Sequence, residues 1–441
     1  MPLRQPIDAL DKACLAATRA PWSSFAPTWK LDLSGDLDVT RFQRALDWAV
    51  ARTPWPAGSI VDGAWVVPDA PRLNIEQATA EQPIVDRFID VRRQPVLEVV
   101  FVSTGARTGT LLFHQHHALA DGRAFLEFLG DFFTALVAVD QGVTTSPLPH
   151  DLVPRRRQAD VLSERGLARL IAFCRGAWVS LSELAAAVRR PVGALPSNTG
   201  TNYDGANRTL HLDVPLERLE RWREPRKAIG LTANDLLAAA LLEALSRWSP
   251  TPGEHSLLFP IDVRPREHFR SFANHLSNLQ LRWTADATRS VLDHARAINA
   301  AVTKQVSARL PWLRVPFDGL MARLTPLAML QRALLDQRRL VTNFSFSNLL
   351  PLGTPGADAS GRWRTTRCQV DRLRITTPCV PPQAVNLTVA RSGDVACFNF
   401  NFKETAVSEA SVEALRALFA KSLDEVDTAL GTCDRATTAG D

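Results

Sequence analysis

The stretch His116-His117-Ala118-Leu119-Ala120-Asp121-Gly122 separates two segments whose side-chain patterns differ. Residues 110–115 before it are rich in apolar side chains and predict a buried strand, whereas residues 123–133 after it carry apolar side chains at helical spacing. We therefore expect the stretch on a tight strand-to-helix connection, where neighbouring groups hold a side chain that still reaches a cleft. A histidine held in this way can serve as a general base near neutral pH.

This seven-residue pattern, His-His-x-x-x-Asp-Gly, resembles the HHxxxDG motif of an acyltransferase superfamily. Its members include chloramphenicol acetyltransferase, plant BAHD acyltransferases, peptide-synthetase condensation domains and bacterial wax ester synthases. The resemblance implies an α/β fold of two similar chloramphenicol acetyltransferase-like lobes, with mixed sheets flanked by helices. It also implies an active-site tunnel between the lobes.

The resemblance further implies how the motif works. The second histidine, here His117, takes a proton from an acceptor hydroxyl or amine that attacks an acyl thioester, and returns it to the leaving thiolate without an acyl-enzyme. The aspartate, here Asp121, makes a salt bridge that holds the loop. The sequence Phe259-Pro-Ile-Asp-Val-Arg264-Pro resembles a BAHD and wax-synthase segment in which Asp-x-Arg follows an apolar strand. Arg264 is therefore the expected partner, with a surface arginine at a strand end as the alternative.

Neighbouring residues are expected to support the catalytic loop. Strand alternation turns His116 away from His117, which predicts a packing or hydrogen-bonding role for His116 and also for His114. Gly122 is expected to permit a close approach or a backbone conformation that a side chain would hinder, with a simple turn glycine as the alternative. His275 lacks a fixing motif and is the weaker candidate for a second base.

Further polar residues are candidates for the tunnel wall or for stabilising the oxyanion of the tetrahedral intermediate. Asn234 opens an apolar helix and resembles a wax ester synthase residue, although helix capping explains it equally well. Asn274 resembles the asparagine of a Gly-Asn segment in related enzymes, with Ala273 in place of the glycine. A predicted strand over 341–349 carries short donors on one face, and a polar face beside water is the alternative. These donors are Asn343, Ser345 and Ser347.

The motif Asp-Phe-Gly-Trp-Gly, which condensation domains and BAHD enzymes carry, is absent from the sequence. The nearest region reads Val-Ala-Cys-Phe-Asn-Phe-Asn-Phe-Lys over residues 395–403. This difference argues against a BAHD enzyme and weakens the assignment to a standard condensation domain. Wax ester synthase-like and stand-alone bacterial acyltransferases fit better.

The length of the chain allows two domains. It has 441 residues, of which 46% are hydrophobic and 22% charged, as in ordinary globular proteins. We expect an N-terminal lobe over 1–150 that carries the motif, a crossover and helical linker over 151–200, a C-terminal lobe over 201–430 and a frayed tail over 431–441. Within the crossover, the basic run Arg155–Arg157 is expected to be a solvated surface or, alternatively, to attract phosphate.

Charge and cysteine content limit the partners and the compartment that the sequence favours. A net charge of +5 does not indicate nucleic-acid binding, but it suits an anionic partner such as a coenzyme A phosphate or a carrier-protein surface. Six scattered cysteines, without a Cys-x-x-Cys pair or zinc spacing, predict a cytoplasmic protein with no bound metal. No signal-peptide pattern and no run of about 18 apolar residues is found, so no transmembrane helix is expected, and peripheral membrane contact stays open.

Together these features predict an acyltransferase that moves an acyl group from a coenzyme A or carrier-protein thioester to an alcohol, forming an ester. No tightly bound cofactor is expected, because acyl-coenzyme A or a phosphopantetheinyl thioester is a co-substrate. The expected partners are this thioester donor and a small-molecule acceptor. Where the donor is a phosphopantetheinyl thioester, an acyl or peptidyl carrier protein is a further expected partner. Two alternatives stay open. One is a free-standing condensation enzyme that forms an amide from carrier-bound substrates, and the other is a non-catalytic scaffold that binds a carrier protein or an acyl ligand.

Overall fold

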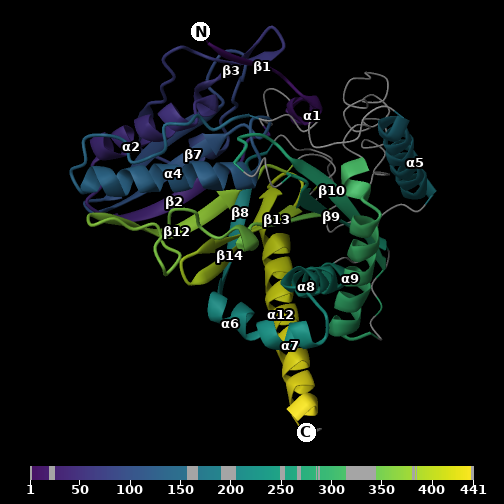
Figure 1. Ribbon diagram of the computed structural model, residues 1–441. Coiled ribbons are helices and arrows are strands. Elements are labelled where there is room, and N and C mark those ends of the chain that lie inside the picture. The colour runs from purple at the N-terminus through teal and green to yellow at the C-terminus, as the bar shows by residue number, and fades with distance from the viewer. Residues whose placement is uncertain are drawn as a thin grey trace.

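The structure is a computed structural model that describes residues 2–18, 25–155, 167–189, 205–248, 254–265, 270–284, 286, 289–313, 344–379, 383 and 385–438. Two larger sheets, each flanked by helices, build two lobes, and a small three-stranded sheet lies near the N-terminus (Figure 1). Both larger sheets contain parallel and antiparallel pairs of strands. The predicted α/β class, with two lobes of mixed sheet flanked by helices, is therefore confirmed.

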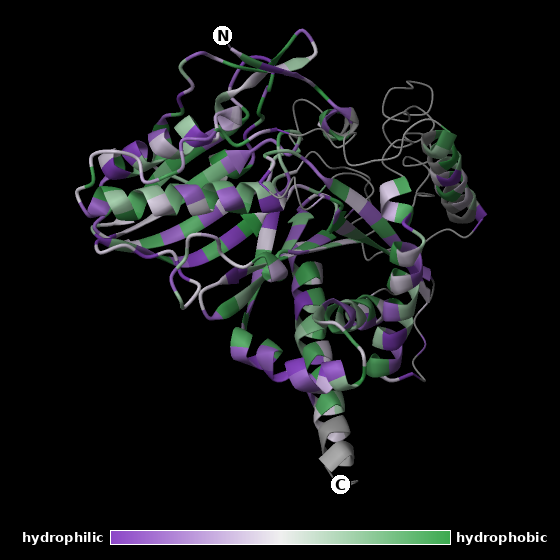
Figure 2. Ribbon diagram, viewed as in Figure 1, coloured by the Kyte–Doolittle hydropathy of each residue, from purple (hydrophilic) through white to green (hydrophobic). Residues whose placement is uncertain are grey.

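The first sheet has five strands in the order β12-β2-β7-β6-β5. Its strands are Cys368–Thr376 (β12), Thr28–Gly35 (β2), Thr108–Gln115 (β7), Leu97–Gly105 (β6) and Ile75–Ala78 (β5). The helices Val39–Arg52 (α2) and Gly122–Asp140 (α4) cover one face, where the alternate residues Trp29, Leu31 and Leu33 of β2 are buried. Figure 2 shows the alternation of hydrophobic and hydrophilic residues along these strands, which is what a sheet with one covered face requires.

The second sheet has six strands in the order β10-β9-β11-β13-β14-β8. Its strands are Leu276–Thr284 (β10), Glu254–Asp262 (β9), Phe344–Asn348 (β11), Val385–Ser392 (β13), Val395–Lys403 (β14) and Asn207–Pro215 (β8). The helices that form its core are Ala233–Trp248 (α8), Val291–Ser307 (α9) and Glu409–Thr438 (α12). In β14, Phe398 and Phe400 belong to this core, whereas Asn399 between them hydrogen-bonds His211 of β8 on the opposite face.

Strand β12 joins the two halves of the chain. It follows β11 in sequence, yet it pairs antiparallel with β2 of the first sheet from Thr376 opposite Thr28 to Cys368 opposite Gly35. Leu373 and Ile375 of β12 belong to the core of the first lobe. The division of the chain at residues 150, 200 and 430 stays a prediction, with the correction that the first lobe includes β12. Helix α12 also continues to residue 438, past the point where a frayed tail was expected.

The remaining described elements surround the two sheets. They are β1 (Leu3–Pro6), β3 (Ser59–Val61), β4 (Ala64–Val67), α1 (Ala9–Ala17), α3 (Gln82–Val85), α5 (Leu167–Arg189), α6 (Leu216–Arg221), α7 (Arg223–Ala228), and the 3-10 turns η1 (Trp55–Ala57) and η4 (Leu350–Leu352). No single helix in the described ranges has the length and apolar content of a membrane span. The segment from α6 through α7, taken with α8, has both, but it is bent by 107°.

Candidate functional site

The motif lies on the expected strand-to-helix connection, between the end of β7 and the start of α4. The backbone N–H of His116 donates to the carbonyl of Val96 (2.9 Å). The side-chain amide of Gln115 donates to the carbonyl of Ala120 (2.9 Å), which closes the turn. Asp121 is the N-cap of α4, because its Oδ1 accepts the N–H of Ala124 (3.0 Å). The connection is therefore fixed by hydrogen bonds at both ends.

His117 is half-buried in the middle of this turn. Its ring stacks on the ring of Phe25, with the centroids 4.9 Å apart and the planes within 7° of parallel. The backbone N–H of His117 donates to the backbone carbonyl of Phe25 (2.8 Å). Its own carbonyl accepts a hydrogen bond from Asn274 Nδ2 (2.7 Å). Backbone and ring are thus held from two directions. Sequence patterns gave no sign of Phe25, since it contributes a ring face and a backbone carbonyl from a distant segment.

The electrostatic surroundings of His117 keep its imidazole neutral. Burial lowers its pKa below the ordinary value of 6.5, and its own backbone carbonyl, Asp121 and Asn274 oppose that shift only in part. Its Nδ1 is a buried atom with no hydrogen-bond partner within the described ranges. A neutral imidazole has one free nitrogen lone pair, which is what a general base needs at pH 7.

His116 forms internal hydrogen bonds through both ring nitrogens. Its Nδ1 accepts the N–H of Ala118 (3.1 Å), so its Nε2 carries the proton and donates to Thr18 Oγ1 (2.8 Å). Thr18 in turn donates to the carbonyl of Cys14 (3.1 Å). Burial lowers the pKa of His116 to about 3, and the neighbouring histidines add to the shift. This geometry supports the hydrogen-bonding role that was expected of His116.

His114 is engaged in the same manner. Its Nδ1 lies 2.8 Å from Thr28 Oγ1, and its Nε2 donates to the carbonyl of Arg87 (3.1 Å). Burial lowers its pKa to about 4, so the ring stays neutral inside the sheet. His114 therefore has the structural contacts that the sequence predicted for it.

Asp121 and Arg264 form a buried ion pair between the two lobes. Arg264 Nη2 donates to Asp121 Oδ2 (2.8 Å), and the side chains are 1% and 0% exposed. His275 N–H donates to the same oxygen (2.8 Å), and Arg264 also pairs with Asp262 (3.1 Å). Burial raises the pKa of Asp121, but Arg264 and the N–H groups of Ala124 and His275 outweigh it, so the pKa lies below its ordinary value. The carboxylate is thus ionised and occupied by protein donors.

Gly122 and Leu349 are in close contact across the lobes. A Cβ at Gly122 would lie 3.2 Å from Leu349 Cδ2, and Gly122 does not have a positive φ. The glycine therefore provides the close approach that was one of its expected roles, rather than an unusual backbone conformation.

The other predicted tunnel residues that the structure describes lie on the second lobe. Asn234 is exposed at the start of α8, where its Oδ1 accepts a hydrogen bond from Asn348 at the end of β11. Ser345 and Ser347 alternate along β11 with buried phenylalanines, and Ser345 Oγ donates to Gln383 (3.4 Å). None of these side chains hydrogen-bonds the 116–121 turn within the described ranges. Asn343 lies outside them. The tunnel and oxyanion roles of these residues stay predictions.

A small, open pocket lies between the first lobe and residues 270–272 of the second. Phe128 and Phe272 line it together with the charged residues Arg52 and Asp131. His117 is not among the described residues that line this pocket, so the predicted tunnel is not identified with it and stays a prediction.

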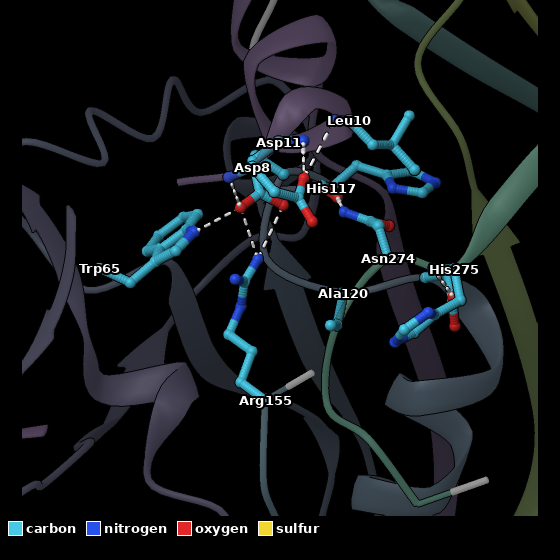
Figure 3. A network of polar contacts seen from close by, with 12 residues as sticks. Asp8, Leu10, Asp11, Trp65, His117, Ala120, Arg155, Asn274 and His275 are labelled. Carbon is cyan, nitrogen blue, oxygen red and sulfur yellow. Dashed lines mark hydrogen bonds and ion pairs between the residues drawn. The ribbon is translucent and has the colours of Figure 1, made fainter. Parts of the chain in front are cut away.

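Arg155 is buried in a network with α1, which corrects the expectation of a solvated or phosphate-binding run (Figure 3). Its Nη2 lies 2.7 Å from both carboxylate oxygens of Asp11, and Trp65 Nε1 donates to Asp11 Oδ2 (2.9 Å). Burial raises the pKa of Asp11, and Arg155 opposes that rise. Asp8 completes a capping box with Asp11 at the start of α1. The expectation failed because the partner carboxylate comes from the distant N-terminal helix; Arg156 and Arg157 lie outside the described residues.

This network has a consequence for the motif, because α1 leads directly to Thr18. Arg155 fixes the start of α1, and Thr18 just past its end holds the Nε2 of His116. The N-terminal helix is thus attached at one end to the crossover segment and at the other to the turn that carries His117.

Comparisons with known proteins identify the fold but not a family. No family model and no curated protein matches the sequence. Among solved structures, the EpoB cyclization-docking bidomain of a nonribosomal peptide synthetase from Sorangium cellulosum is similar, with 16% identity, coverage of 96% of this chain and 83% of that chain, and a TM-score of 0.72. Polyketide synthase associated protein 5 from Mycobacterium tuberculosis has 17% identity, coverage of 91% and 95%, and a TM-score of 0.66.

A condensation domain is also among the similar structures. The first condensation domain of the calcium-dependent antibiotic synthetase, in complex with a substrate analogue, has 13% identity, coverage of 96% of this chain and 95% of that chain, and a TM-score of 0.69. Identities this low carry information on the fold alone. The chain therefore has the two-lobe fold of these condensation and cyclization domains.

Proposed function

We propose that this protein is an acyltransferase in which His117 is the general base and the acyl donor is a thioester on coenzyme A or a carrier protein. One observation carries the proposal: the His117 imidazole is held in an HHxxxDG turn by Phe25 and Asn274 beside a buried ion pair that spans the lobes. A scaffold that only binds a partner has no need of a base fixed in this way. The fold shared with condensation domains adds support for a donor bound to a carrier.

The proposed reaction moves one proton and exchanges one bond. His117 takes the proton from the acceptor hydroxyl while the acceptor oxygen attacks the thioester carbonyl carbon. The tetrahedral intermediate then expels the thiolate, which takes the same proton back from the imidazolium. The products are an ester and a free thiol, and the enzyme ends as it began. Asp121 stays ionised throughout, since Arg264 and two backbone N–H groups occupy its oxygens.

Amide formation is the second candidate, in which an amine replaces the alcohol. The specific observation in its favour is the similarity of the fold to a condensation domain over 96% of this chain. The absence of Asp-Phe-Gly-Trp-Gly from the sequence weakens the assignment to a standard condensation domain. The two candidates use the same base and differ in the acceptor, so one assay separates them.

The test is thiol release from acyl-coenzyme A, acyl-pantetheine and acyl-carrier protein, each with a panel of alcohols and amines. We expect release that depends on the acceptor and falls by about 10²–10⁴-fold in His117→Ala, because the base is lost. His150→Ala is the matched control, since this histidine is exposed. Full activity of His117→Ala would reject the catalytic assignment. If all three donor classes stay inert with every acceptor, the scaffold alternative replaces the proposal.

A further inference from the structure

Asn274 is buried at the junction of the two lobes, with 1% of its surface exposed. The backbone on either side of it belongs to the interlobe ion pair: the Ala273 carbonyl accepts from Arg264 Nη2 (3.2 Å), and His275 N–H donates to Asp121 Oδ2 (2.8 Å). The side chain of Asn274 is thus placed by its neighbours and has little freedom to move.

The amide group of Asn274 contacts His117 through its nitrogen. Its Nδ2 donates to the His117 carbonyl (2.7 Å), and Figure 3 shows the amide beside the imidazole ring. Asn274 Oδ1 and His117 Nδ1 are both buried, and neither has a hydrogen-bond partner within the described part of the chain. A buried acceptor and a buried ring nitrogen can satisfy each other where that nitrogen carries the proton.

We propose that Asn274 is a positioning residue that fixes both the orientation and the tautomer of His117. Its Nδ2 holds the backbone carbonyl of His117, and its Oδ1 keeps the imidazole proton on Nδ1. The lone pair then remains on Nε2, which leaves that nitrogen free to act as the base. Because Asn274 belongs to the second lobe and His117 to the first, the base is complete only when the lobes are docked.

This inference rests on the proposed function for its kinetic consequence, but the tautomer can be measured without any substrate. Heteronuclear NMR of the imidazole nitrogens in histidine-labelled protein, with His117→Ala to identify the signal, reports which nitrogen is protonated. We expect a single Nδ1–H form of His117 in the wild type and a mixture of both tautomers in Asn274→Ala. Asn274→Asp keeps an acceptor beside the ring, and we expect it to retain the Nδ1–H form.

Turnover provides the second readout. We expect kcat of Asn274→Ala to fall roughly 100-fold with little change in KM, since a misplaced base slows proton transfer without weakening substrate binding. Asn274→Asp should also lose turnover, because it no longer donates to the His117 carbonyl. Asn74→Ala is the matched control at an exposed asparagine of the first lobe and should keep wild-type turnover. Melting temperatures of all variants show whether each remains folded.

The outcomes separate the inference from the proposed function. An unchanged single tautomer in a folded Asn274→Ala would overturn the positioning role, whatever the turnover. A mixed tautomer in that variant supports it even if no thioester is turned over, in which case only the proposed reaction fails. If Asn274→Ala does not fold, Asn274→Asp decides, because loss of its Nδ1–H form would contradict an acceptor role for the side chain.

Discussion

Both carboxylate oxygens of Asp121 accept hydrogen bonds from the protein itself. Oδ1 accepts from Ala124 N–H, and Oδ2 accepts from Arg264 and from His275 N–H. Burial alone would raise the pKa of Asp121, but these donors bring it below the ordinary value of 3.8. The carboxylate therefore contributes to stability, and His117 is left as the titratable residue of the motif with a nitrogen available to substrate.

Replacing Arg264 tests this assignment. We expect Arg264→Met to lower the free energy of unfolding by about 3–5 kcal/mol at pH 7, because Asp121 stays buried without its counter-ion. A carboxylate whose pKa is lowered by folding contributes its full stabilisation above its pKa in the unfolded chain, which is 3.8. This stabilisation is lost as the pH falls through the lower pKa of the folded state. The difference in the free energy of unfolding between Arg264→Met and the wild type should therefore be smaller at pH 3 than at pH 7. Urea titration at both pH values measures it.

The control for Arg264 is an exposed ion pair. Arg221 pairs with Glu217 at 3.2 Å on the surface of α6, where 63% of the arginine side chain is exposed. Arg221→Met should change the free energy of unfolding by less than about 1 kcal/mol. Equal unfolding free energies for Arg264→Met and the wild type at pH 7 would show that the interlobe pair does not stabilise the fold.

At the scale of elements, helix α4 and the loop after η4 pack closely because two glycines face each other. A Cβ on Gly130 would lie 2.9 Å from the backbone oxygen of Pro355, and a Cβ on Gly356 would lie 2.6 Å from the Gly130 oxygen. Gly356 also has a φ of +71°, which a side chain would strain. The loop is thus fixed on the helix that follows the motif.

Adding one methyl group to α4 tests this contact. Gly130→Ala should lower the free energy of unfolding by about 1–3 kcal/mol, because the backbone of Pro355 has to shift to admit a Cβ. Gly431→Ala in α12 is the control, since nothing lies within 4 Å of its Cβ position. That variant should be neutral or stabilising by about 0.5–1 kcal/mol, as in any open helix interior. A Gly130→Ala protein as stable as Gly431→Ala would contradict close packing here.

At the scale of the whole molecule, the first lobe is completed by a late part of the chain. Strand β12 covers the edge of β2, and Trp363 just before it also belongs to the core of that lobe. An unpaired β2 would expose a row of backbone donors and acceptors. The lobes are therefore not independent folding units, although each has its own core.

A fragment of residues 1–155 tests this dependence. We expect the fragment to aggregate or to bind hydrophobic dyes, since it lacks β12, whereas the full chain should stay soluble and bind no dye. Adding a synthetic peptide of residues 361–379 should restore solubility, and a scrambled peptide serves as its control. A soluble fragment with native near-ultraviolet circular dichroism and no peptide would show that the first lobe folds without β12.

The fold class and the position of the motif could be predicted from the sequence, because both depend on local periodicity and on a short spaced pattern. The contact of Asn274 with His117 could not, since it ends on a backbone carbonyl and leaves no pattern in residue types. The prediction for Arg155 was wrong because charge runs are usually solvated, and no local pattern shows that its partner is Asp11 of a distant helix. Strand β12 was not predicted at all, and side-chain alternation would in any case identify a strand and not its neighbour.

The pairing of β12 with β2 also limits how substrates can enter. The strand has nine residues, and a hinge opening that separates the lobes would have to break this ladder or bend the chain on either side of it. Small sliding movements of the lobes leave the ladder intact. If the proposed function holds, a thioester donor with a long, narrow arm would reach His117 without the separation of the lobes that a bulky substrate would need.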